Sequence, residues 1–259
     1  MTDTATVPVC FRPLGGPTVL IEYGKMRFLV DPTFDPAGVY SIGSRVLTKT
    51  NDAVVGPEEV APVDAVLLSH DQHPDNLDLG GRAFAQHAPL VVTTRLAASR
   101  LAGNCRGLQP GETIDLGAVS VTAVPALHGP EGSEDKTGPV IGFVLEASGS
   151  PTVYVSGDNA SLAVVRQIAQ RFARIDVAVL FAGAARTPLV DGFLTLTNEQ
   201  AVDAARILGY PLVLPVHTDG WAHFTQDGES LRAAFEEAGL ARLLLRADPA
   251  VPARVGMQD

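Results

Sequence analysis

A chain of 259 residues, 46% hydrophobic and 19% charged, has the composition of a globular protein that can bury a large core and is far from a disordered composition. Its 29 acidic residues against 19 basic residues give a formal net charge of −10, which disfavours extended contact with a phosphate backbone, so we expect no nucleic-acid partner. No apolar run approaches the about 20 residues that span a bilayer, and the N-terminus lacks a basic segment followed by an apolar one. We therefore expect a cytoplasmic protein with no membrane partner.

The two cysteines give no sign of a disulfide or of a thiolate metal site. Cys10 and Cys105 lie far apart in the sequence and belong to no CxxC pattern. We expect both to be buried free thiols.

The first part of the chain predicts a pair of strands. Residues 18–23 (TVLIEY) and 27–31 (RFLVD) are short apolar runs joined by a Gly-Lys-Met connection, which is typical of a β-hairpin. Two Asp-Pro pairs within residues 31–36 then favour extended or turn backbone and end the hairpin. Residues 39–60 show no clear periodicity, and we expect a long surface excursion there.

The next part predicts a βαβ unit followed by antiparallel strands. Two buried strands, 64–69 (DAVLLS) and 89–94 (PLVVTT), flank one helical segment, and a second, short helix follows. Three further strands are separated by turns that are rich in glycine or acidic residues: 119–126 (VSVTAVPA), 140–147 (VIGFVLEA) and 151–158 (PTVYVSGD). We expect these three strands to pair in antiparallel fashion.

The last part alternates helices and strands. The pattern predicts helices at 159–172, 196–209 and 227–240 and strands at 176–182, 211–217 and 241–247. Thr197 is the expected N-cap of the second helix, with Gln200 at the capping-box position, and Gly209 ends it. Because no repeat, low-complexity linker or break in composition is present, we expect one domain over residues 1–259, with two packed sheets and helices outside.

Candidate metal ligands follow the ends of four predicted strands, where loops gather functional groups on a rigid scaffold. They are His70, Asp71, His73, Asp75 and Asp78 after the first strand of the βαβ unit, and His128, Asp158 and His217 after later strands. Each residue taken singly has a plainer reading as a hydrogen-bonded turn residue. Their joint recurrence indicates a metal site instead.

Imidazole and carboxylate ligands suit zinc, and manganese or iron accept similar sets. A histidine-rich pocket with an aspartate that can bridge would place two ions about 3.5–4 Å apart, so that a shared water is acidified and attacks an ester, amide or phosphoryl centre. The ligand types therefore predict hydrolysis by a metal-bound hydroxide.

The segment LLSHDQHPDNLD resembles a divergent form of the HxHxDH motif of the metallo-β-lactamase superfamily, with the trailing Leu-Asp of its lactonase-like branch. PALHG, YVSGD and LPVHTDGWAHF are similar to the segments of the third histidine, the bridging aspartate and the final histidine, and TVLIEYGKMRFLVDP to the opening hairpin. These blocks occur in family order from Thr18 to Phe224. The resemblance implies an α/β fold, a four-layer αββα sandwich with metals at one edge between the sheets.

The chain departs from the motif at two positions. A strict match from His70 puts Gln72 at the second histidine, and one inserted residue before Asp75 aligns DNLD with the family's DHLD, with Asn76 at the last motif histidine. The second histidine is then either replaced by Gln72 or supplied by His73. His73 is favoured, because imidazole outcompetes a carboxamide for such metals.

Under this alignment the resemblance implies two neighbouring ligand sets: His70, His73 and His128 in one, and Asp75, Asp158 and His217 in the other, which lacks its usual extra histidine. One or two ions, zinc or else manganese or iron, are expected.

Several further residues are candidates for supporting roles. Asp71 is a candidate proton acceptor, alongside the catalytic carboxylates Asp75 and Asp158, or else a solvated turn residue. Gln72 and Asn76 are candidates to contact substrate or support ligands. His223 could orient a ligand, touch substrate or be structural; Trp221 could line the pocket mouth, Asp78 cap the following helix, and His87 be exposed.

The leading hypothesis is a metal-dependent hydrolase of a small-molecule lactone, ester, amide or phosphoester, in a chain that could form a homo-oligomer. The alternative is a catalytically degenerate member that binds a ligand without hydrolysis, because Gln72 and Asn76 replace stronger donors by neutral amides. Redox chemistry at a di-iron centre is disfavoured, since no flavodoxin-like extension follows Asp259.

Overall fold

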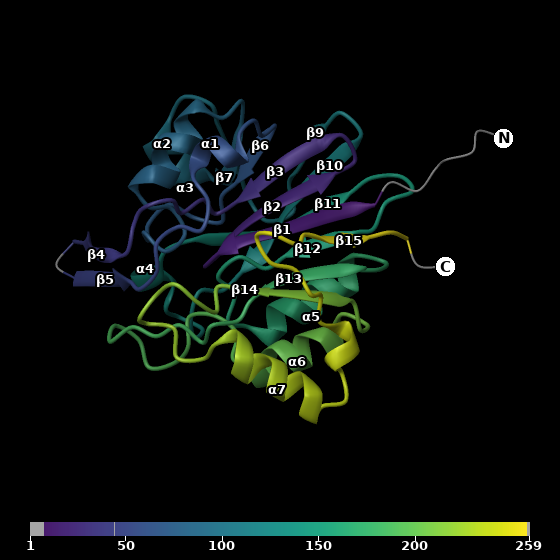
Figure 1. The fold of residues 1–259 in the computed structure, drawn as a ribbon. Helices are drawn as coiled ribbons and strands as arrows, with labels where there is room; N and C mark the ends of the chain where they lie inside the picture. The colour runs from purple at the N-terminus through teal and green to yellow at the C-terminus, as the bar shows by residue number, and fades with distance from the viewer. Residues whose placement is uncertain (1–7, 44, 258–259) are drawn as a thin grey trace.

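Two β-sheets lie face to face in the computed structural model, which describes residues 8–43 and 45–257, and helices cover both outer faces (Figure 1). The first sheet has the strand order β15 (Ala253–Val255), β1 (Val9–Gly15), β2 (Thr18–Tyr23), β3 (Met26–Val30), β6 (Ala65–Leu67), β7 (Val91–Thr94), β8 (Cys105–Leu108). The second has the order β14 (Leu212–Val216), β13 (Val177–Phe181), β12 (Val153–Val155), β11 (Val140–Glu146), β10 (Val119–Ala126), β9 (Thr113–Leu116). A separate hairpin pairs β4 (Gly38–Ile42) with β5 (Arg45–Lys49).

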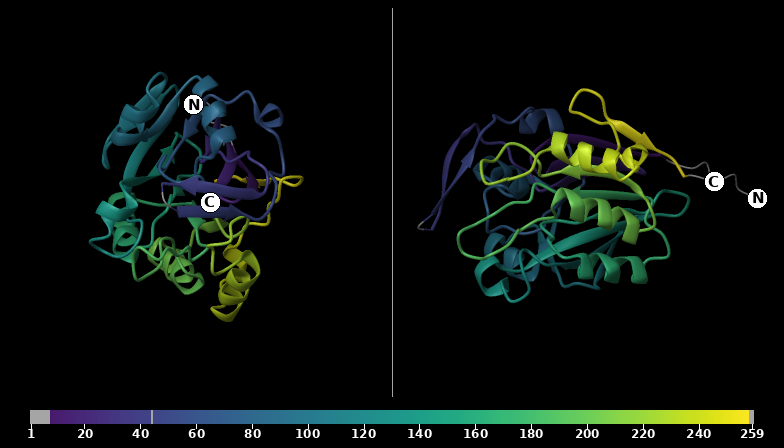
Figure 2. Two further views of the ribbon diagram at one scale, coloured as in Figure 1. Left: turned by 90° about the vertical axis from the view of Figure 1, so that its left-hand side faces the viewer. Right: turned by 90° about the horizontal axis from the view of Figure 1, so that it is seen from below.

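The helices form the two outer layers. The first sheet is covered by α1 (Pro57–Val60), α2 (Leu79–His87) and α3 (Arg95–Leu101), and the second by α5 (Leu162–Arg171), α6 (Asn198–Ile207) and α7 (Gly228–Glu237). Seen from below, α5, α6 and α7 lie side by side, and the β4–β5 hairpin projects away from the body (Figure 2). The short helix α4 (Glu134–Thr137) lies in the loop between β10 and β11. Among the described residues, none of the helices is long and apolar enough to cross a membrane.

The pleat of the strands separates the cores. Successive side chains of a strand point to opposite faces, so β2 sends Val19 and Ile21 into the core between the sheets and Leu20 toward the helices. Tyr154 of β12 likewise faces the layer of α5, α6 and α7. Burial of an aliphatic side chain such as Val19, Leu20 or Ile21 stabilises the fold by about 1.5–3 kcal/mol. The four-layer αββα arrangement expected from the sequence is confirmed.

Most of the elements predicted from the sequence are confirmed. The hairpin of β2 and β3, the parallel βαβ unit of β6, α2 and β7, and the antiparallel series β10, β11 and β12 all form. The capping box of α6 forms as well: the Thr197 side chain accepts from the backbone N–H of Gln200 at 3.2 Å, and the Gln200 side chain accepts from the Thr197 backbone. Cys10 and Cys105 are free, although Cys105 is only partly buried.

Several stretches differ from the prediction. Residues 39–60 form the β4–β5 hairpin and α1 instead of an irregular excursion. Residues 241–247 contain the 3-10 turn η1 (Ala241–Leu243) instead of a strand, because Leu243 packs into the helix-side core and only one bridge, Val213 to Leu244, joins this stretch to β14. β1, which pairs with both β2 and β15, was not predicted, and neither were β8, β9, β15 and the short helix α4.

Candidate metal centre

The candidate ligands meet at the edge of the sandwich where several strands end. β12, β13 and β14 run parallel, so the residues after their carboxyl ends gather at one edge; Asp158 and His217 are among them. His70 follows β6 of the facing sheet, and the backbone N–H of Ile141 donates to the Ser69 carbonyl at 3.2 Å, which ties this loop to the second sheet. Side chains far apart in the sequence therefore face one small volume.

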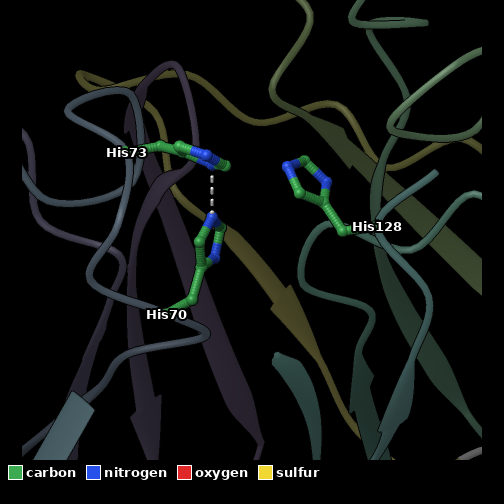
Figure 3. A group of neighbouring side chains, drawn as sticks. All are labelled: His70, His73 and His128. Atoms are coloured by element: carbon green, nitrogen blue, oxygen red, sulfur yellow. Dashed lines mark hydrogen bonds between the residues drawn. The ribbon is translucent and has the colours of Figure 1, made fainter. Parts of the chain in front are cut away.

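Three histidines form the first cluster. His70, His73 and His128 converge with ring centroids 5.0–5.3 Å apart (Figure 3). The His70 Nε2 and His73 Nδ1 atoms lie 3.0 Å apart. One ligand atom from each ring lies within 4.8 Å of the others, so all three could hold a single ion. Gln72, the alternative to His73, is outside this cluster.

Hydrogen bonds fix which nitrogen of His70 is free. The Ser69 hydroxyl donates to Asp31 Oδ2 at 2.6 Å, which uses its only proton. The contact of 2.9 Å between Ser69 Oγ and His70 Nδ1 is then donated by the ring. In the neutral imidazole this leaves the lone pair of Nε2 facing the cluster. Burial, with His73 and His128 nearby, lowers the pKa of His70 well below 6.5.

His128 is arranged in the same manner. Its Nδ1–H donates to the Leu194 carbonyl at 3.0 Å, while its Nε2 is buried with no hydrogen-bond partner in the described part of the chain. Burial and the neighbouring His73 lower the pKa of His128 from 6.5 to about 3. The ring is therefore neutral near pH 7, with Nε2 unprotonated and able to bind a cation.

The second cluster contains two carboxylates and one histidine. His217 Nε2 lies 3.3 Å from Asp75 Oδ2 and 3.6 Å from Asp158 Oδ1. Burial raises the pKa of Asp158 well above its usual range, and the nearby Asp75 and Asp31 add to this shift. Burial alone would also raise the pKa of Asp75, but its contacts with His223 and His217 hold that pKa well below the usual value.

Unpaired buried atoms in both clusters fit a divalent cation. Among the described residues, Asp75 Oδ1, Asp158 Oδ2 and His128 Nε2 are buried and have no hydrogen-bond partner. An unsatisfied buried polar group typically costs about 1–3 kcal/mol, and more if it is charged. A cation held by these atoms would remove that cost, and the mixture of imidazole nitrogen and carboxylate oxygen is the set that zinc, iron and manganese accept.

Asn76, which the sequence alignment places at the last motif histidine, joins two carboxylates. Its Nδ2 donates to Asp31 Oδ2 at 3.1 Å and to Asp158 Oδ1 at 3.2 Å. Asp31 also accepts from the backbone N–H of Ser69 at 2.7 Å, and burial raises its pKa to about 7. Sequence reasoning did not include Asp31 among the site residues. Its Asp-Pro pair at the end of the hairpin was the available signal.

Asp71 and Gln72 lie apart from both clusters. The Asp71 carboxylate, whose side chain is 3% exposed, forms an ion pair with Arg100 of α3. The Gln72 side chain accepts from Arg100 at 3.2 Å and donates to the Pro139 carbonyl at 3.3 Å. Both residues therefore attach the loop of His70 to its surroundings, and the Asp71 carboxylate is engaged by Arg100.

Asp78 caps α2, as expected. Its side chain accepts from the backbone N–H of Gly81 at 2.7 Å and lies 3.2 Å from the Lys49 ammonium, inside the protein. His87, at the end of the same helix, is exposed as predicted.

Trp221 is buried beneath the β4–β5 hairpin. Its ring centroid lies 5.9 Å from that of Tyr40 in β4, and the backbone of Trp221 forms a bridge with Lys49 of β5. His223, two residues further on, approaches Asp75, with 3.1 Å between His223 Nε2 and Asp75 Oδ2. The hairpin therefore lies over the segment that carries His223.

Unusual backbone geometry accompanies the site. Asp31 and His217 have positive φ angles of 36° and 58°, which non-glycine residues rarely adopt. Gly157, just before Asp158, has φ of 55°, and a Cβ there would lie 2.7 Å from the Ile141 carbonyl oxygen and 3.0 Å from Ser69 Cβ. Only glycine lets the two loops approach this closely.

Comparisons with known proteins agree with this geometry. The beta-lactamase superfamily domain matches residues 26–218. A UPF0173 metal-dependent hydrolase of Methanosphaerula palustris is 31% identical over 86% of this chain and 89% of the relative. Another from Pelotomaculum thermopropionicum is 30% identical over 89% and 93%.

Solved structures share the fold. An isothiocyanate hydrolase from Delia radicum gut bacteria has a TM-score of 0.81 at 21% identity, covering 97% of this chain and 99% of that one. A possible metal-dependent hydrolase from Veillonella parvula has a TM-score of 0.80 at 16% identity, covering 98% and 100%. With the match of the superfamily domain and the curated relatives, these likenesses show that the chain belongs to the beta-lactamase superfamily and, within it, to the UPF0173 metal-dependent hydrolases.

Proposed function

We propose that the chain hydrolyses a small-molecule lactone, ester, amide or phosphoester, with zinc as the preferred metal and manganese or iron as alternatives. The observation that carries this proposal is the convergence of unpaired, buried nitrogen and carboxylate atoms from two clusters on one edge of the sandwich. The metal-dependent hydrolases among its relatives support the reaction class.

The proposed ligands fall into the two clusters described above: His70, His73 and His128 in the first, and Asp75, Asp158 and His217 in the second. A bound divalent ion would polarise the carbonyl or phosphoryl oxygen of the substrate and lower the pKa of water. The protein fixes the ligand orientations: Ser69 orients His70, and the Leu194 carbonyl orients His128. Asp75 and Asp158 are the proposed carboxylates for proton transfer.

The β4–β5 hairpin is the proposed determinant of substrate choice. The backbone N–H of Thr50, just after β5, donates to the Gly220 carbonyl at 2.8 Å, and that of Ala222 donates to the Thr48 carbonyl at 2.9 Å. Arg45 of β5 donates to the Thr187 hydroxyl at 3.1 Å, which joins the hairpin to the loop after β13. A substrate that reaches the clusters would contact these loops.

The proposal is tested by metal analysis and by assay together. Protein reconstituted separately with zinc, manganese and iron is analysed for metal content and assayed on a lactone, a carboxylic ester, an amide and a phosphodiester. We expect stoichiometric metal and turnover of at least one class. His128→Ala should lose both, whereas His87→Ala, on an exposed helix end, should lose neither. Wild-type protein that binds no metal after reconstitution would overturn the proposal.

A further inference from the structure

The second cluster is one imidazole short of the usual set, and the residue at that position cannot supply it. Asn76 directs its amide N–H groups at two carboxylates, Asp31 and Asp158. The reverse orientation of the amide would place its carbonyl oxygen against both carboxylates, which is electrostatically unfavourable. Asn76 therefore acts as a hydrogen-bond donor that fixes Asp158, and an imidazole for the second cluster must come from elsewhere in the chain.

His223 lies where that ligand is needed. Its Nε2 is 3.1 Å from Asp75 Oδ2, and the Nε2 of His217 is 3.3 Å from the same oxygen. The His223 side chain is 14% exposed, and its ring stands edge-on to Phe224, with 4.6 Å between the ring centroids. Its carbonyl accepts from the backbone N–H of Arg186 at 3.1 Å, so the backbone that carries the ring is held in place.

Two of the three donor–donor distances in the second cluster fall in the range expected between ligands of one ion, and the third, from His223 to Asp75, is slightly shorter. Metal–ligand bonds of about 2.0–2.2 Å in a tetrahedral arrangement separate neighbouring donor atoms by about 3.3–3.6 Å. Asp75 Oδ2 lies at 3.1 Å from His223 and at 3.3 Å from His217, and His217 lies at 3.6 Å from Asp158 Oδ1.

Which oxygen of Asp75 faces His223 indicates whether His223 binds the ion itself or only orients the Asp75 carboxylate. A histidine that only orients a metal-binding carboxylate is expected at the oxygen turned away from the ion. His223 instead approaches Asp75 Oδ2, the oxygen that also lies near His217, so one ion can be held by this oxygen and both imidazoles. Asp75 Oδ1, which has no hydrogen-bond partner in the described part of the chain, stays available to a neighbouring ion.

We propose that His223 is a metal ligand of the second cluster and replaces the motif histidine whose position Asn76 occupies. The second ion is then held by Asp75, Asp158, His217 and His223. This assignment rests on the proposed metal-dependent activity. It places one ligand on the segment beneath the β4–β5 hairpin, so the second ion is connected to the loop that is proposed to select the substrate.

Metal binding tests the assignment without reference to activity. Zinc stoichiometry and affinity are measured by chelator competition, and cobalt-substituted protein is examined by visible absorption, for the wild type, His223→Gln, His223→Asp and the control His87→Gln. Glutamine retains an N–H donor for Asp75 but is a poor ligand, whereas aspartate is a ligand without a donor. Circular dichroism checks that each variant is folded.

We expect the wild type and His87→Gln to bind two ions. His223→Gln should lower the affinity for the second ion by more than the about 10–100-fold that loss of a supporting hydrogen bond costs. It should also remove the visible absorption of cobalt bound in the second cluster. His223→Asp should recover part of the affinity. A loss of about 100-fold or less in His223→Gln would overturn the assignment, and so would a single ion in the wild type. A wild type that binds no ion would overturn the proposed function itself.

Discussion

The stability of the metal-free protein should depend on pH through His128. The ring is buried and its pKa is lowered from 6.5 to about 3 in the folded state. As the pH falls below 6.5, the unfolded chain takes up a proton at this residue while the folded chain does not. Because the unfolded state then binds more protons, the free energy of unfolding must decrease with acidity between about pH 6.5 and pH 3.

The magnitude follows from the two pKa values. One pKa unit corresponds to about 1.36 kcal/mol, so the contribution of this residue falls by about 2 kcal/mol between pH 7 and pH 5. His128→Asn isolates it, because the Asn amide can take over the Nδ1–H bond to the Leu194 carbonyl but does not titrate. Between pH 7 and pH 5, the free energy of unfolding of the wild type should therefore fall by about 2 kcal/mol more than that of His128→Asn.

Urea unfolding in the presence of a chelator at pH 7, 6 and 5, followed by circular dichroism, measures this difference. His87→Asn is the matched control, because it makes the same replacement at an exposed histidine at the end of α2, outside both clusters. A difference between wild type and His128→Asn that does not change from pH 7 to pH 5 would refute the reasoning, since it would mean that His128 takes up its proton equally in both states.

Three further outcomes are expected. Ser69→Ala removes the hydroxyl that orients His70 and should weaken metal binding by about 10–100-fold in chelator competition. The control Ser99→Ala, at an exposed serine, should bind metal as the wild type does. Equal affinities of Ser69→Ala and the wild type would contradict the role of Ser69. Gly157→Ala should lower the free energy of unfolding by more than about 2 kcal/mol, against about 1 kcal/mol for Gly149→Ala, where a Cβ meets nothing; equal losses in urea unfolding would argue against the close approach. Arg100→Ala leaves a buried carboxylate unpaired and should cost about 1–2 kcal/mol in urea unfolding without changing metal content, whereas loss of metal would show that the pair supports the site.

The layered fold could be predicted from the sequence because its signals are local. The strand 18–23 places alternate apolar side chains on its two faces, and the capping box at Thr197 and Gln200 defines the start of a helix, whatever the rest of the chain does. Residues 241–247 were misassigned because a short apolar run buries equally well as a strand or as a turn against helices.

The candidate ligands were also within reach of the sequence, because each lies in the loop that follows a strand and strand ends converge at one edge of a sheet. The hydrogen-bond and ion-pair partners of the site residues could not be predicted in this way. Asp71 pairs with Arg100 on α3, and Asn76 connects Asp31 to Asp158 across the two sheets. These contacts join residues far apart in the chain.

The contact of His223 with Asp75 likewise could not be predicted from the sequence, because the two residues are 148 positions apart in the chain. Residue order and periodicity determine which side chains leave a strand toward the site edge, because they depend on neighbours only a few positions away. Which donor faces which acceptor depends on how the two sheets pack and on where the β4–β5 hairpin lies. Tertiary structure alone therefore decides which polar groups are paired and which remain available to bind a metal.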